Sequence, residues 1–394
     1  MGMSELPKGW AETTLGEVAT FQRGFDLPKK DRCDGNYPLM VSNGQDGTHN
    51  NYKVKAPGIV TGRSGTLGKI FYVKENFWAL NTTLWVKDFH GNDVKFLYYF
   101  FKTFPFERYN SGSGVPTLNR NHIHPLPVKI PALKEQKSIA DILSSFDDKI
   151  ELLRAQNKTL ETLAQTIFKE WFVKFNFPGA TGEMIDSEFG DIPKGWNSAL
   201  IKDLPIVISD FVANGSFASL KENVTLYQDK TEYALFIRNT DLKSNFKEKT
   251  YVDKHSYNFL KKTQLSGGEV IISNVGDVGS VFICPHLGMP MTLGNNIIML
   301  KSKFNNFLYL LFSGYIGQHL IKGITGGSAQ PKFNKTDFRS LSIIVPTEYI
   351  LSEFESISQQ IFDKITNNNS QIQTLEKTRD ALLPKLMNGN IRVV

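Results

Sequence analysis

The sequence predicts an α+β protein in which two similar α+β domains alternate with two long helices. These helices are expected to pair as an intramolecular antiparallel coiled coil with pseudo-two-fold symmetry. Three observations lead to this prediction. Apolar residues recur at spacings of three and four along residues 134–172, and the same stripe returns 215 positions later, within residues 349–388. The stretch before each stripe also carries the same five short motifs in the same order.

The two stripes have the spacing of helices that bury one narrow face against another helix. The first stripe consists of Phe146, Ile150, Leu153, Asn157, Leu160, Ala164, Ile167 and Trp171. The second consists of Ile361, Ile365, Asn368, Ile372, Leu375, Arg379, Leu382 and Leu386. In an antiparallel pairing an a position meets a d position, so Asn157 and Asn368 could meet and fix the register of the helices. The alternative is that both asparagines face solvent.

The motifs before the stripes indicate an internal duplication. They are Pro-Lys-Gly-Trp at residues 7–10 and 193–196, Gly-x-x-Gly at 65–68 and 276–279, Phe-Leu-Tyr at 96–98 and 307–309, Gly-Ser-x-x-Pro-x-[Leu/Phe]-Asn at 112–119 and 327–334, and a proline at 131 and 346. We therefore expect a first domain at residues 1–133, a first spacer helix at 134–173, a linker at 174–191, a second domain at 192–348, a second spacer helix at 349–388 and a tail at 389–394.

Short β-branched or apolar runs bounded by glycine and polar turns predict the strands of each domain. These runs lie at residues 39–43, 58–61, 69–73 and 83–86, and then at 234–238, 269–273, 280–283 and 296–300. Amphipathic spacing predicts a helix at residues 95–104 in the first domain and at 307–321 in the second. Asn119 is a candidate N-cap for a single helical turn that Pro125 ends.

The composition is that of a globular protein with room for two cores, since the chain has 394 residues. Its two cysteines, Cys33 and Cys284, lie in different domains, which fits a reduced cytoplasmic setting better than a disulfide framework. Residues 1–10 lack the apolar core of a signal peptide. The longest apolar run, residues 94–106, is interrupted by lysines and is too short to span a bilayer, so we expect no membrane association.

Positive charge is concentrated in the two domains. Residues 1–130 contain 16 Lys or Arg against 11 Asp or Glu, and residues 190–345 contain 17 against 12. The helical segments carry a small negative surplus. This distribution is expected if the domains face phosphate, although such a surplus is also ordinary for a protein surface.

Taken together, these motifs resemble those of the specificity subunits of type I restriction–modification enzymes. The resemblance is carried by the Pro-Lys-Gly-Trp starts, the Gly-Ser-x-x-Pro segments, the Ile-Pro-x-Leu-x-Glu-Gln run at residues 130–136 and the linker at 186–193. It covers the whole chain. It implies that each globular domain is a target recognition domain that reads half of a bipartite DNA site, and that the two helices form a spacer between them.

The resemblance also implies the partners. They would be double-stranded DNA, two methyltransferase subunits that bring S-adenosylmethionine, and motor-nuclease subunits that bring ATP and Mg. This chain itself is expected to bind no cofactor and no metal. A paired segment of about 27 residues would be roughly 40 Å long and one turn of duplex is about 34 Å, which predicts a gap of roughly 5 to 8 unread base pairs.

The loop at residues 62–69 is the strongest candidate for DNA contact in the first domain. Its glycines let main-chain amides approach phosphate, and Arg63 could fork onto a guanine edge. The candidate residues of this domain are Gly62, Arg63, Ser64, Gly65, Lys69, Asn81, Thr82, Ser113 and Arg120. Turn chemistry is the alternative for Asn81 and Thr82, and a hinge into the helix is the alternative for Ser113. The loop is not a P-loop, because Ile70 stands where Ser or Thr would hold magnesium.

The second domain offers a matching set of contact candidates. They are Ser273, Asn274, Gly276, Asn295, Asn296, Ser328, Lys332 and Lys335. Asn274 could read adenine bidentately, with a plain tight turn as the alternative, while the lysines suit phosphate. Different residues at matched positions fit two half-sites of different sequence.

No catalytic motif is recognised in the sequence. An adenine methyltransferase would need an Asn-Pro-Pro-aromatic motif, and the pairs His122-x-His124 and Cys284-x-His286 lack further ligands at zinc spacing. We therefore expect a non-catalytic DNA-recognition subunit. Two alternatives remain: a coiled-coil-linked scaffold for protein interactions, and a nuclease with an unrecognised site. Steep weakening of binding by salt would separate DNA recognition from protein scaffolding.

Overall fold

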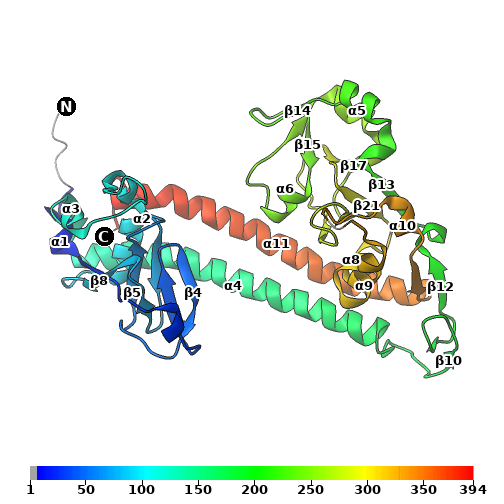
Figure 1. Cartoon of the computed structure of the whole chain (residues 1–394), viewed down its shortest axis with the longest axis horizontal. Helices are drawn as coiled ribbons and strands as arrows, with labels where there is room; N and C mark the ends of the chain where they lie inside the picture. The colour runs from blue at the N-terminus through cyan, green and yellow to red at the C-terminus, as the bar shows by residue number, and fades with distance from the viewer. Residues whose placement is uncertain (1–6, 328, 394) are drawn as a thin grey trace. The chain divides into compact units, whose positions relative to one another are not determined.

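The structure, a computed structural model, describes residues 7–327 and 329–393. The chain divides into two compact units, Met1–Ala155 with Asn368–Val394, and Gln156–Asn367. Each unit contains one α+β domain and a part of each long helix, α4 (Leu133–Phe172) and α11 (Glu348–Met387) (Figure 1). The predicted combination of two α+β domains with two long helices is therefore confirmed.

In the first unit, the start of α4 lies along the end of α11. Asp147 pairs with Arg379, and Arg154 pairs with Glu376 at 2.6 Å. Residue numbers rise along α4 while they fall along α11, so the helices run antiparallel. Beside these ion pairs, an apolar cluster is formed by Ile150, Leu153, Ile372 and Leu375. Four predicted stripe positions thus meet as expected.

In the second unit, the end of α4 packs against the start of α11. Phe168 and Trp171 contact Phe354 through edge-on and tilted rings, with centroids 6.0 and 5.8 Å apart, respectively. The stripe residues Ala164, Trp171, Ile361 and Ile365 are buried in the same cluster. Asn157 is buried in this unit and Asn368 is buried in the first, and their pairing across the helices remains a prediction.

The first domain is built around a four-stranded antiparallel sheet with the order β2-β8-β5-β6. A two-stranded pair, β1 with β9, and a three-stranded sheet, β4-β3-β7, complete it. The strands are β1 (Trp10–Thr14), β2 (Thr20–Arg23), β3 (Tyr37–Val41), β4 (Gly44–His49), β5 (Gly58–Gly62), β6 (Ile70–Val73), β7 (Trp78–Ala79), β8 (Thr83–Asp88) and β9 (Pro127–Pro131). The helices are α1 (Leu15–Val18), η1 (Lys29–Asp31), α2 (Val94–Thr103), η2 (Phe106–Tyr109) and α3 (Arg120–Ile123).

The second domain repeats this plan with additions. Its four-stranded sheet has the order β13-β21-β18-β19, its terminal pair is β12 with β22, and its other sheet has the order β14-β16-β15-β20-β17. A further two-stranded pair joins β10 (Met184–Ile185) to β11 (Ile192–Pro193). The other strands are β12 (Asn197–Leu200), β13 (Val207–Asp210), β14 (Leu226–Tyr227), β15 (Ala234–Ile237), β16 (Tyr251–Val252), β17 (Gln264–Leu265), β18 (Val270–Ser273), β19 (Val281–Ile283), β20 (Met291–Leu293), β21 (Ile297–Lys301) and β22 (Ser342–Val345). The helices are η3 (Ile201–Asp203), η4 (Phe211–Asn214), α5 (Phe217–Asn223), α6 (Asn239–Lys243), α7 (Lys254–Phe259), η5 (Lys261–Thr263), α8 (Asn305–Ser313), α9 (Tyr315–Ile324) and α10 (Lys335–Arg339).

The predicted single helix at residues 307–321 is wrong. The structure has two helices, α8 and α9, separated by Gly314 in an extended conformation with ψ of 173°. Gly317 allows the tight packing after the break, because a Cβ there would lie 2.3 Å from the carbonyl oxygen of Leu311. The side-chain amide of Gln318 donates to the main-chain carbonyl of Phe312 at 2.6 Å. This bond provides a donor for a carbonyl in the last turn of α8.

The helix α2 attaches the first sheet to the long helices. Its own N-cap, Asp93, accepts a hydrogen bond from the N–H of Phe96 at 2.8 Å. Phe96, Leu97 and Phe101 are buried in the first core together with Ile139 and Leu143 of α4. None of the helices in the described part of the chain combines the length and hydropathy that a bilayer crossing requires.

Candidate nucleic-acid interface

Three loops of the first domain meet at one end of its main sheet. They are residues 62–69 between β5 and β6, residues 80–82 before β8, and residues 110–118 before α3. The N–H of Arg63 donates to Thr82 O at 2.8 Å, and Arg63 O accepts from the N–H of Leu118 at 2.8 Å. The N–H of Gly65 donates to Pro116 O at 2.9 Å. We call these three loops the first junction.

The second domain builds the same arrangement from residues 273–280, 294–296, and 326–327 with 329–333, which we call the second junction. The N–H of Asn274 donates to Asn296 O at 3.1 Å, and Asn274 O accepts from the N–H of Phe333 at 3.0 Å. The N–H of Gly276 donates to Pro331 O at 2.9 Å. Each of these three bonds has its counterpart in the first junction, so the duplicated motifs create two equivalent main-chain scaffolds.

Glycine is required at specific points of both junctions. Gly65 and Gly276 have positive φ values of 94° and 79°, a conformation that other residues rarely adopt. Gly62 has an ordinary φ, but a Cβ there would lie 1.6 Å from Thr66 O. These glycines therefore allow the main-chain conformation of the loops. Contacts with a ligand would have to come from the neighbouring side chains.

In the first junction, a chain of polar contacts joins two arginines. The guanidinium of Arg63 donates through Nη1 to Asn81 O at 3.0 Å. The side-chain amide of Asn81 donates to Asp26 Oδ1, and Arg23 donates to the same oxygen at 2.9 Å. Of these residues, sequence reasoning identified Arg63 and Asn81 but missed Arg23 and Asp26.

The missed pair is brought to the junction by Gly24. A Cβ on Gly24 would lie 2.1 Å from Leu80 O, so only glycine lets the end of β2 approach this closely. The N–H groups of Gly24 and Phe25 donate to Thr83 O and Ala79 O at 3.0 and 2.7 Å. The sequence signal was the glycine directly after β2, but it does not indicate which distant strand the chain approaches.

The second junction carries different side chains. The amide of Asn274 donates to Phe333 O at 3.2 Å, so this predicted base reader is engaged by the chain itself. Asp277 forms an ion pair with Lys243 and accepts from Ser280. The hydrogen bonds from Lys243 and Ser280 hold the pKa of the Asp277 carboxyl below its ordinary value of 3.8. Lys243 and Asp277 were also missed by sequence reasoning, because their pairing depends on the position of α6.

The remaining predicted residues are distributed around the junctions. Exposed positions are held by Lys69, Ser113, Arg120, Asn295, Asn296 and Lys332, while Ser64 and Thr82 are half-buried. Ser273 is fully buried. Lys335 pairs with Asp210 at 2.8 Å, and Asn334 caps the helix that Lys335 begins. Ser328 lies outside the described residues.

Across residues 7–327 and 329–393, no three His, Cys, Asp or Glu side chains gather as ligands would. His124 accepts a hydrogen bond from the N–H of Phe21 at 3.0 Å, and burial followed by the nearby Arg120 lowers its pKa below 6.5. Burial raises the pKa of the Cys284 thiol, so this cysteine is a poor nucleophile at neutral pH.

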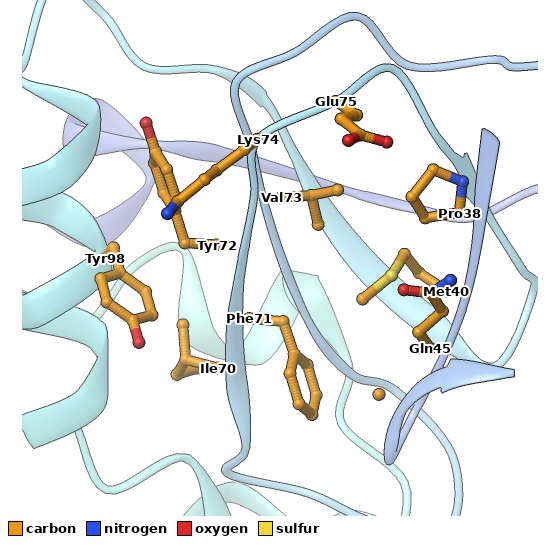
Figure 2. A pocket seen from close by; sticks show the side chains of 11 residues that line it. Pro38, Met40, Gln45, Ile70, Phe71, Tyr72, Val73, Lys74, Glu75 and Tyr98 are labelled. Carbon is orange, nitrogen blue, oxygen red and sulfur yellow. The ribbon is translucent and has the colours of Figure 1, made fainter. Parts of the chain in front are cut away.

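A cavity of about 460 Å³ opens beside β6 in the first unit. Figure 2 shows Pro38 and Met40 of β3 on one side of it, Phe71 of β6 in its middle and Tyr98 of α2 on the other side. Lys74, which also lines it, is paired with Glu151 of α4 at 2.8 Å. The cavity shares no lining residue with the first junction, so it is distinct from the candidate interface.

Known proteins resemble this chain over most of its length. Residues 7–162 and 195–383 match the family described as the type I restriction modification DNA specificity domain. The type I restriction enzyme MjaIX specificity subunit of Methanocaldococcus jannaschii is 31% identical over 314 residues, which cover 76% of this chain and 69% of that protein. The HindI specificity subunit of Haemophilus influenzae is 26% identical over 342 residues, covering 71% and 72%.

A solved structure supports the same fold. The crystal structure of the type I restriction–modification system S subunit from M. genitalium covers 98% of both chains, with a TM-score of 0.65 at 15% identity. This likeness concerns the fold, and membership is established by the family match across most of the chain together with the MjaIX relative. The chain thus belongs to the DNA specificity subunits of type I restriction–modification systems, the non-catalytic subunits of those enzymes.

Proposed function

We propose that this subunit binds double-stranded DNA through its two junctions, and that each junction reads one half of a bipartite target. The observation that carries this proposal is the pair of equivalent main-chain scaffolds with different side chains. Arg63 and Thr82 occupy the first scaffold, whereas Asn274 and Asn296 occupy the corresponding positions of the second. Equal scaffolds with unequal side chains suit two half-sites of unequal sequence.

Phosphate contact would position each domain on the duplex. Lys69 and Arg120 are exposed near the first junction, and Lys332 is exposed in the second. The N–H groups and glycines of the loops allow close approach to the backbone, while side chains read the base edges. Because positive charge is concentrated in both domains, we expect affinity to fall steeply as salt rises.

The proposal extends to partners. Two methyltransferase subunits would dock on the long helices and supply S-adenosylmethionine, and restriction subunits would supply ATP hydrolysis and Mg-dependent cleavage. Leu152 and Leu163, which are 61% and 46% exposed on α4, offer apolar contact for such docking. The same proposal places the chain in the cytoplasm, together with the host DNA and these subunits.

Sequencing the methylation pattern of the host genome would test the proposal directly. The expected result is one split adenine motif that disappears when the gene for this chain is deleted. Exchange of residues 1–130 for those of a relative should then change one half of the motif and leave the other unaltered. A host without any split motif, or an exchange that alters both halves, would contradict the proposal.

A further inference from the structure

The side chains of Asp26 and Asn81 set each other's orientation in the first junction. A carboxylate only accepts hydrogen bonds, so the amide nitrogen of Asn81, rather than its oxygen, faces Asp26. Asp26 is in turn held by Arg23, with Nη2 at 2.9 and 3.3 Å from the two carboxylate oxygens. The Asp26 side chain is 64% exposed, so this contact contributes little to stability and chiefly fixes geometry.

This orientation leaves one acceptor and one donor of the Asn81 side chain for a further partner. One amide N–H is engaged by Asp26, while Oδ1 and the second N–H remain for another partner. Adenine presents a donor at N6 and an acceptor at N7 in the major groove, and asparagine matches that pair bidentately. Arg63, whose Nη1 is held by Asn81 O, keeps its other guanidinium N–H groups for a guanine edge.

We propose that Asp26 is a specificity-determining residue of the first domain, because it holds the Asn81 amide in the orientation that reads an adenine next to the base read by Arg63. This inference rests on the proposed function and adds to it the chemistry of one base contact. Asp26 acts through Asn81 and is therefore a positioning residue. Neither Arg23 nor Asp26 belongs to a motif of the duplicated sequence.

The test is a selection of DNA targets from randomised duplexes by the full-length chain, expressed with the host's modification subunits. Asp26→Ala should lower discrimination about tenfold at one base pair of one half-site, the range of a single base contact. Asn81→Ala should affect that same base pair. Asp26→Asn retains an acceptor for the amide and should keep most of the preference. The second half-site serves as an internal control in every variant.

Asp46→Ala is the matched control. Asp46 is an equally exposed carboxylate of the same domain, 62% exposed and paired with Arg32 at 3.4 Å. Asp46→Ala removes the same negative charge as Asp26→Ala. Any general gain of affinity for phosphate should therefore appear in both variants, while only Asp26→Ala should change base preference.

Three results would overturn the inference or its basis. Unchanged preference in Asp26→Ala at every base pair contradicts it while leaving the proposed function intact. If Asp26→Ala does not fold, Asn81→Ala decides, because unchanged preference in that variant also contradicts it. A wild-type chain that selects no motif would instead refute the proposed function.

Discussion

The carboxylate of Glu355 accepts a hydrogen bond from the main-chain N–H of Asn306 at 2.9 Å, and so α11 caps the first turn of α8. A second bond comes from the N–H of Phe307 at 3.3 Å. The residue before α8, Phe304, provides no side-chain cap of its own. In the first domain the corresponding helix α2 is capped by its own Asp93, so the two domains attach to the long helices through different polar contacts.

Replacement of Glu355 by alanine should destabilise the second unit. Asn306 and Phe307 are both buried, so their N–H groups would lose their acceptors without gaining water. We expect a loss of about 1 to 2 kcal/mol in the free energy of unfolding at pH 8, measured by urea denaturation. Glu353→Ala, at an exposed position on the same turn, should change stability by less than about 0.5 kcal/mol. Equal losses in both variants would contradict the capping role.

The same carboxyl should make stability depend on pH. Burial raises the pKa of Glu355 to about 7 from its ordinary 4.5, against the two main-chain hydrogen bonds, which lower it. The folded chain therefore holds this proton more tightly than the unfolded chain. The free energy of unfolding should fall by roughly 3 kcal/mol as pH rises from 4.5 to 7, and then level off above that range. Glu355→Gln should remove this component, and a slope identical to that of the wild type would contradict it.

Asp147 joins α2 to both long helices in the first unit. It accepts from the hydroxyl of Tyr99 at 2.6 Å and pairs with Arg379. Burial, followed by this hydrogen bond, raises the pKa of Tyr99, which stays protonated and donating at neutral pH. Asp147→Ala leaves both partners without their carboxylate, and a loss of about 2 kcal/mol is expected in urea denaturation.

Two further variants check the origin of that loss. Asp147→Asn keeps an acceptor for Tyr99 and should cost less than the alanine variant. Asp148→Ala removes the exposed neighbouring carboxylate and should be close to neutral. A loss in Asp148→Ala as large as in Asp147→Ala would show that net charge, rather than this contact, is responsible.

The elements with a local periodic signal were predictable from the sequence. The stripes of α4 and α11 repeat over many turns, and the strands β5, β6, β8 and β18 are short β-branched runs bounded by glycine or polar residues. The closing pairs were not predictable, because they depend on partners far away in the chain. Trp10–Thr14 pairs with Pro127–Pro131, and neither segment alternates polar and apolar residues clearly enough to reveal its partner.

Part of the candidate site was likewise predictable from the sequence, and part was not. The duplicated glycines predicted the loops of both junctions, since the need for glycine is local to each turn. Asp26 and Asp277 were missed because exposed carboxylates have no periodic signal and acquire a role only from their neighbours. Likewise, Leu351 stands in the second repeat where Gln136 stands in the first. Gln136 accepts a hydrogen bond from the main-chain N–H of Asp93 beside α2. Beside α8, a main-chain N–H is instead bound by Glu355, one turn further along α11.

Gly62→Ala should disrupt the first junction because the position has no room for a side chain. The added Cβ would meet the main-chain oxygen of Thr66 at 1.6 Å, and a main-chain atom cannot turn aside as the end of a flexible side chain can. We expect a loss of about 3 kcal/mol in the free energy of unfolding of the first unit. Gly114→Ala is the control for stability, since a Cβ there meets nothing within 4 Å and it should cost less than about 0.5 kcal/mol. DNA selection by Gly62→Ala should lose one half of the motif and retain the other, and a variant that keeps both halves would show that the loop at residues 62–69 does not read DNA.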